Sequence, residues 1–180
     1  YKRQPLMHII AAKAAGFLEA LRPEFKDYIK SVLANAKILS ETLKNNGFKI
    51  YSGGTDTHLM LVDLRPFNVK GNSASESLCK ANITCNKNGI PFDTEKPMIT
   101  SGIRLGSQAA TTRGFGLKEF EIVGKLITKV IDGLSKNPND NSKVEDEVRK
   151  EVVSLCSSFP IYKNLRKWFA QYAKKEKLQL

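Results

Sequence analysis

Cysteine, histidine and long apolar runs are scarce in this chain of 180 residues. Cys79, Cys85 and Cys156 form neither a C-x-x-C pair nor an even-numbered disulfide framework, so we expect reduced, mostly structural thiols and no metal site. No apolar run reaches the roughly 20 residues that a membrane span needs, and the first residues contain no small-residue cleavage site. These absences predict a soluble, cytoplasmic globular protein that is neither secreted nor bound to a membrane.

The basic residues are in excess, and the excess is concentrated near the carboxyl terminus. Of the net charge of +11, +5 falls on residues 163–180, in which Leu165, Trp168, Phe169 and Tyr172 recur at helical spacing. This pattern predicts a basic amphipathic helix. We favour a terminal helix that docks its apolar stripe on the body over an arm that binds RNA or a membrane surface. The charge therefore does not predict a nucleic-acid partner.

Hydrophobic periodicity predicts alternating helices and strands around one small sheet, which places the fold in the α/β or α+β class. Residues 6–21 form an almost continuously apolar helix, which we expect to be covered by other parts of a protein. The other predicted helices are 24–47 with Gly47 as its stop, one that begins at Ser73, 117–135, and 143–159 after a linker at 136–142. The predicted strands are 48–51, 58–64, a short one near 83–85, and 103–105.

The segment TSGIRLGSQAATTRGFG, residues 100–116, places an arginine among very small residues. Arg104 lies on a short apolar strand between two glycines, which let backbone or a ligand approach closely. We expect its guanidinium to be partly buried and to need an anion, and its planar fork suits a carboxylate or a phosphate. An ion pair with Asp63 or Asp93 of the same fold is an equally good explanation from these residues alone.

Other polar residues give weaker signals. Arg113, which follows two threonines, suits a loop cap or a phosphate ligand, and we favour a structural role. His58 at the head of a strand and His8 in the apolar helix are more typical of hydrogen-bonded structural histidines than of catalytic bases. The segment NKNGIPFD, residues 86–93, has turn chemistry and alone predicts only a loop.

Four segments together resemble one known family. PLMHIIAAKA, SGGTDTHLMLVDLR, ITCNKNGIPFD and TSGIRLGSQAATTRGF occur in the order and spacing of serine hydroxymethyltransferase. That pyridoxal-phosphate enzyme interconverts serine and glycine with tetrahydrofolate in one-carbon metabolism and glycine biosynthesis. The resemblance runs from about residue 5 to residue 162 and implies the carboxyl-terminal portion of the enzyme. The implied fold is the C-terminal domain of the aspartate-aminotransferase-like transferases, a small sheet packed with helices.

The resemblance also implies a division of the chain. Residues 1–22 would be the end of the large, cofactor-binding domain, and residues 23–135 the connecting helix and the small C-terminal domain. Residues 136–162 would be a linker and the C-terminal helix of the small domain. Residues 163–180 extend beyond the usual end of the family as the basic amphipathic segment.

Site residues carry over from the family at matching positions. Arg104 stands where the family's arginine holds the α-carboxylate of the substrate amino acid. The folate contacts of the family fall on Asn88 and on Lys96, Pro97 and Met98. A phenylalanine is usual where Met98 stands, so the resemblance implies backbone contacts to folate at this segment more than stacking on Met98.

The cofactor half of the family's site has no counterpart in this sequence. No lysine matches the cofactor lysine, and Arg3 and Gln4 replace two glycines that bind the cofactor phosphate of the neighbouring subunit. We therefore expect a chain that is inactive alone and does not hold pyridoxal phosphate covalently. It would act as a homodimer or larger homo-oligomer, or with a complementary amino-terminal half. The alternatives are a truncated product or fragment of the enzyme and a non-catalytic remnant that serves as a binding or interaction module.

Overall fold

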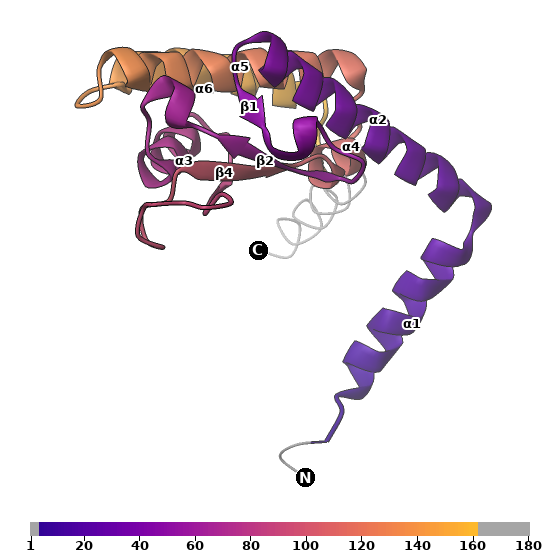
Figure 1. Cartoon of the computed structure of the whole chain (residues 1–180). Helices are drawn as coiled ribbons and strands as arrows, with labels where there is room; N and C mark the ends of the chain where they lie inside the picture. Colours follow the sequence, from indigo (N-terminus) through magenta and orange to yellow (C-terminus); the bar gives the residue numbers. More distant parts are fainter. Residues whose placement is uncertain (1–3, 162–180) are drawn as a thin grey trace, which may run out of the picture.

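The computed structural model describes residues 4–161, which form one body and a projecting helix (Figure 1). The projecting helix is α1 (Met7–Leu21), and the other five helices and four strands belong to the body. The amphipathic helix predicted for residues 163–180 lies outside the described residues.

The sheet of the body is small and entirely antiparallel. Its strands are β1 (Lys49–Ile50), β2 (Leu59–Asp63), β3 (Asn86–Asn88) and β4 (Gly102–Gly106), in the order β1-β2-β4-β3. Because no pair of these strands is parallel, the domain is α+β, which is the second of the two predicted classes.

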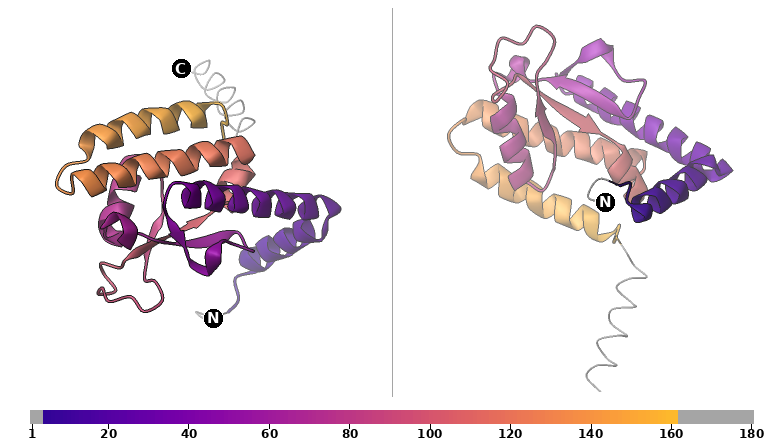
Figure 2. Two further views of the ribbon diagram at one scale, coloured as in Figure 1. Left: turned by 45° about the horizontal axis from the view of Figure 1, so that its top comes forward. Right: turned by 90° about the horizontal axis from the view of Figure 1, so that it is seen from below.

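Helices pack against the core side of this sheet. α2 (Pro23–Asn45), α3 (Gly71–Lys80) and α5 (Leu117–Lys136) contribute buried side chains to one core with the strands. α6 (Ser142–Ser157) packs on α5 and α3 and forms the outer layer (Figure 2). The helices therefore leave the other side of β4 available for a site.

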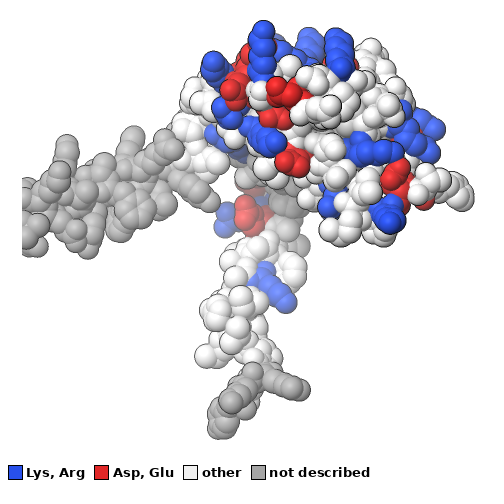
Figure 3. Space-filling model, turned by 90° about the vertical axis from the view of Figure 1, so that its left-hand side faces the viewer, with Lys and Arg blue, Asp and Glu red and all other residues white. Residues whose placement is uncertain are grey.

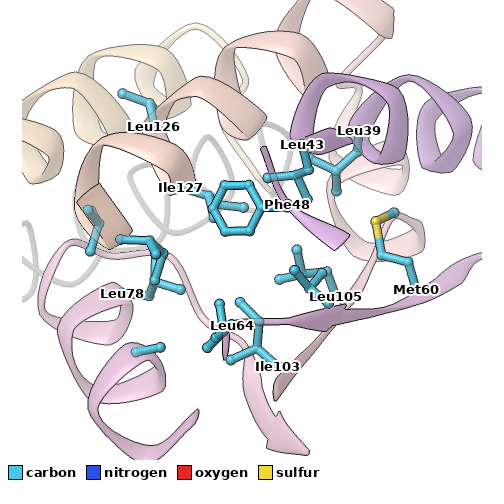
Figure 4. Close-up of a cluster of buried hydrophobic side chains, with 14 of the residues drawn as sticks. Leu39, Leu43, Phe48, Met60, Leu64, Leu78, Ile103, Leu105, Leu126 and Ile127 are labelled. Atoms are coloured by element: carbon cyan, nitrogen blue, oxygen red, sulfur yellow. The ribbon is translucent and has the colours of Figure 1, made fainter. Parts of the chain in front are cut away.

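The core follows the predicted periodicities. Leu39 and Leu43 recur at helical spacing on α2, while Met60 on β2 and Ile103 and Leu105 on β4 alternate with outward residues (Figure 4). Burying side chains of this size contributes roughly 1.5–3 kcal/mol each before entropy is counted. The apolar stripe of α2 is shorter than predicted, since Ile29 and Leu33 are exposed on the half of the helix that extends toward α1 (Figure 1).

Two short elements differ from the sequence prediction. The strand expected near 83–85 is at Asn86–Asn88, because Asn82 turns the chain in the left-handed region and Ile83 still donates to the carbonyl of Leu78. The segment NKN is therefore a strand and not a loop. A short helix that the sequence did not predict, α4 (Gln108–Arg113), follows β4.

α1 is apolar and has no buried residue. Met7, Phe17 and Leu21 are among its exposed apolar side chains, and its few contacts are with the start of α2. In Figure 3 the projecting segment is mostly uncharged, whereas acidic and basic side chains are mixed over the visible face of the body. No helix within residues 4–161 is long and apolar enough to cross a membrane.

Candidate functional site

The site is built on the face of the sheet that points away from the core. On β4, Ile103 and Leu105 are buried and Arg104 between them is exposed, so the guanidinium belongs to the outward face. Arg104 is opposite Leu61 of β2 and Asn86 of β3. Neither neighbour is charged. The expectation of a partly buried Arg104 is wrong, because the outward position on the strand exposes its side chain.

The structural ion pair considered for Arg104 is not formed. Asp63 accepts from Nε and a terminal nitrogen of Arg65, the latter at 2.7 Å. Asp93 accepts from residues of its own loop. No acidic side chain within residues 4–161 makes an ion pair with Arg104. The guanidinium is therefore available for an external anion as far as the described residues are concerned.

The β3–β4 connection is next to this arginine. Asn88 is opposite Gly102 and therefore shares the outward face with Arg104. Asn88 is half-buried, and its side-chain amide donates to the carbonyl of Gly89 at 2.7 Å. Its side-chain oxygen makes no hydrogen bond to any described residue, so it remains free to accept one from a ligand.

The loop after β3 carries the other residues that the resemblance assigns to folate. Lys96, Pro97 and Met98 are all exposed. The Lys96 carbonyl accepts from the amides of Ile99 and Thr100, at 2.8 and 3.0 Å, which gives this segment a defined turn. The structure thus brings these three residues into the connection that leads directly into the strand of Arg104.

Asp93 anchors this loop, a role that the sequence analysis did not assign. Its carboxylate accepts from the amides of Ile90, Glu95 and Ser101 and from the Ser101 hydroxyl. Although burial opposes it, these four hydrogen bonds hold the pKa of Asp93 well below its usual range. An aspartate within a Pro- and Gly-containing segment is a typical signal for such side-chain to backbone bonding, and it was available in the sequence.

Close approach explains the two glycines around Arg104. A Cβ on Gly102 would lie 2.5 Å from Cγ2 of Ile90 and 2.7 Å from the carbonyl oxygen of Val62. A Cβ on Gly106 would lie 2.8 Å from the side-chain oxygen of Gln108. The glycines therefore admit neighbouring protein atoms at both ends of the strand.

Arg113 has the structural role that we favoured. Its Nε donates to the carbonyl of Phe159 at 2.8 Å, and a terminal nitrogen donates to the carbonyl of Cys156 at 3.0 Å. These carbonyls are at the end of α6, where a cation is favourable.

His8 and His58 are both exposed and make no side-chain hydrogen bond to a described residue. The prediction that they are hydrogen-bonded structural histidines is therefore wrong.

The thiols and the other possible metal ligands of the described residues do not form a metal site. Cys79, Cys85 and Cys156 are free, and burial, together with the Cys79 thiol, raises the pKa of Cys85 to about 11. Within the described ranges, no three His, Cys, Asp or Glu side chains are grouped as metal ligands would be. Gln4, one of the two residues at the cofactor-phosphate position, is exposed, and Arg3 lies outside the described residues.

The fold and site together define an α+β domain that presents one arginine and an anchored loop on the outward face of its sheet. The chain belongs to the serine hydroxymethyltransferase family, whose model matches residues 2–127. The family therefore accounts for most of the described chain.

Bacterial relatives of the same name extend the match. The chain is 84% identical over 166 residues to a serine hydroxymethyltransferase of Pelagibacter ubique, an alignment that covers 92% of this chain and 38% of the relative. It is 62% identical over 163 residues to that of Marinomonas sp., covering 91% and 38%. It is 61% identical over 158 residues to serine hydroxymethyltransferase 2 of Ralstonia nicotianae, covering 88% and 37%. The chain thus spans less than two fifths of the length of these relatives.

Proposed function

We propose that this chain supplies the substrate-carboxylate and folate contacts of a serine hydroxymethyltransferase, which interconverts serine and glycine with tetrahydrofolate. The observation that carries the proposal is the exposed guanidinium of Arg104, which has no acidic partner among the described residues. A surface arginine without a partner, held on a rigid strand, suits bidentate binding of a carboxylate. We assign the other contacts of the site to folate, at Asn88 and at the exposed segment of Lys96, Pro97 and Met98.

Arg104 would orient the amino acid and not perform chemistry itself. Two parallel hydrogen bonds from a planar guanidinium fix both the position and the rotation of a carboxylate, and this fixes the substrate's α-carbon. Because β4 is paired with a strand on each side, the position of Arg104 varies less than that of a residue in a loop. When bound, pyridoxal phosphate would supply the electron sink for the bond that breaks at that carbon.

The sequence lacks the family's residues for holding pyridoxal phosphate. No segment of the chain resembles the family's cofactor-lysine motif, and Gln4 carries a side chain where the family has bare backbone. We therefore propose that the cofactor is held by polypeptide other than the described residues.

The proposed function also divides the chain into domains. α1 would be the end of the large domain, α2 the connecting helix, and the rest of the body the small domain. We also propose a homo-oligomer in the cytoplasm, where three free cysteines remain reduced.

A hybrid enzyme tests this function. The chain is joined to the remaining part of the Pelagibacter ubique relative, with Arg3→Gly and Gln4→Gly restoring the family's glycines. We expect the hybrid to convert serine to glycine only when tetrahydrofolate is present, while the chain alone does not. The unaltered relative is the positive control.

The alternative, a non-catalytic remnant, makes a different prediction for the same protein. A hybrid that folds and binds pyridoxal phosphate, yet neither binds serine nor forms glycine, would contradict the proposed function and favour the remnant.

A further inference from the structure

The loop of residues 89–101 is closed on itself by one carboxylate. Asp93 Oδ2 accepts from the amides of Ile90 at 3.2 Å and Ser101 at 2.9 Å, and Oδ1 accepts from the amide of Glu95 at 3.0 Å and the hydroxyl of Ser101 at 2.7 Å. Ile90 follows β3 and Ser101 immediately precedes β4. The same carboxylate therefore holds both ends of the loop.

The carboxylate is suited to this role because it stays ionised. Its pKa is held well below the usual range by the Ser101 hydroxyl and the three amides, in spite of burial. Hydrogen bonds to an ionised acceptor are shorter and stronger than those between neutral groups. At neutral pH all four bonds are therefore charge-assisted.

Other contacts tie the outer part of the loop to α3. Lys70 pairs with Glu95 at 2.5 Å, and the amides of Gly71 and Asn72 donate to the carbonyls of Thr100 and Ile99, both at 2.9 Å. Thr100 is buried and has a positive φ of 62°, a conformation that is uncommon for a residue with a side chain. The segment from Glu95 to Thr100 is thus bound to Lys70 and the start of α3. Asp93 binds Glu95 at the start of this segment and Ser101 just after its end.

We infer that Asp93 is a positioning residue for both substrates, acting through the loop and through the start of β4. This inference rests on the proposed function and adds a residue to it. Asp93 sets the segment Lys96–Met98 for folate through Glu95, and through Ser101 it holds the end of the loop that leads into β4 and Arg104. It makes contact with neither ligand itself.

The first test measures substrate affinities in the hybrid enzyme. Asp93→Asn keeps the shape of the side chain but replaces one acceptor oxygen by a donor, so the bond from at least one of the three amides is lost, and the remaining bonds are no longer charge-assisted. We expect the KM for tetrahydrofolate to rise about tenfold, and the Kd for serine to rise severalfold, with kcat changed much less. A displacement of about 1 Å of a positioning group can lower activity roughly a hundredfold. We expect a smaller effect here, because the loop keeps its contacts with Lys70 and α3.

A matched variant separates positioning from stability. Asn141→Ala removes a buried side chain that donates to the Ser77 hydroxyl and to the Val130 carbonyl, both at 3.0 Å, and that makes no hydrogen bond to this loop. We expect it to lower the Tm at least as much as Asp93→Asn, with both substrate affinities retained. Unchanged affinities in Asp93→Asn, or equal losses in both variants, would overturn the inference.

The second test uses the full chain alone, so that it does not depend on catalysis. Asp93→Asn should accelerate hydrogen exchange at the amides of Glu95, Ile99, Thr100 and Ser101 by about tenfold or more, and leave the β2–β4 amides unchanged. If the unmutated hybrid is inactive, the proposed function fails, and this exchange measurement decides the loop role separately. Equal exchange in the variant and the parent chain would overturn it.

Discussion

Gly102 begins β4 in a space that does not admit a methyl group. Its neighbours there are a side-chain methyl of Ile90 and the carbonyl oxygen of Val62, and a Cβ on Gly71 would likewise lie 2.5 Å from the Gly102 carbonyl. The loop end, the central strand and the start of α3 are therefore in direct backbone contact. This contact fixes the strand that carries Arg104.

We predict that Gly102→Ala destabilises the chain by about 1–3 kcal/mol, because backbone has to move to admit the new methyl group. Urea unfolding followed by circular dichroism measures the change. Gly16→Ala is the control, since a Cβ there meets nothing within 4 Å and alanine raises helix propensity by roughly 0.5–1 kcal/mol. Equal stability of Gly102→Ala and the parent chain would show that this packing is not tight.

At the scale of elements, two aspartates hold the ends of the central strands in place. The pKa of Asp63 is lowered, in spite of burial, by hydrogen bonds and charge attraction from Arg65 at the end of β2. The pKa of Asp93 is lowered by its own loop at the start of β4. Both carboxylates are bound more favourably when ionised in the folded state than in the unfolded chain.

We therefore predict acid-dependent loss of stability. The contribution of each aspartate is fully present above its unfolded pKa, near 3.9, and is lost as the pH falls through the lower folded pKa. Urea unfolding from pH 7 to pH 2 measures the free energy of unfolding for the parent chain and for Asp93→Asn. The difference between them should be largest at neutral pH and should shrink below about pH 4. A difference that is constant over this range would contradict the assigned hydrogen bonds.

The sequence predicted those elements whose side chains show a clear period. α2, α5 and α6 have apolar stripes, β2 is a short apolar run, and in β4 the charged Arg104 stands between two apolar residues. β3 could not be predicted, because the strand NKN is polar and is formed by pairing with β4 and not by its own side chains. The helix α4 has only small and polar residues, and it depends on Ser107 and on the turn at Gly114.

The candidate site was predictable in its residues but not in its geometry. The position of Arg104 came from the family resemblance, whereas its exposure depends on which face of β4 points toward the helices. That choice is made by Ile103 and Leu105, both buried. The role of Asp93 depends on the folding of a loop whose amides converge on one carboxylate, and the spacing of residues alone does not specify this.

At the scale of the whole molecule, α1 exposes apolar side chains that no other described residue covers. Phe17 is 68% exposed and Leu21 is 83% exposed, on a helix that has no buried residue and packs mainly against α2. Contiguous apolar surface of this kind marks a place where other protein packs. In the proposed function, that protein is the large domain or a second subunit.

We predict that the full chain self-associates through this helix. Light scattering should give a mass above that of the monomer, and the mass should fall to the monomer value in a Phe17→Lys, Leu21→Lys double variant. Circular dichroism should show unchanged helix content in that variant, since both positions are exposed and lysine is a good helix former. A parent chain that is monomeric at high concentration and binds no dye for exposed apolar surface would contradict the prediction.

The central claim is that Arg104 binds the carboxylate of the amino-acid substrate, and serine titration of the hybrid enzyme with Arg104→Lys tests it most directly. Lysine keeps the charge but loses the fork, so one of two charge-assisted bonds, worth roughly 1.5–3 kcal/mol, should be lost. We expect serine affinity to fall by about ten- to a few hundredfold, with binding of pyridoxal phosphate and the Tm nearly unchanged. Arg113→Lys, at an arginine that instead caps α6, should lower the Tm and leave serine affinity intact. Intact serine binding in Arg104→Lys, together with weaker cofactor binding or an unfolded domain, would contradict the claim.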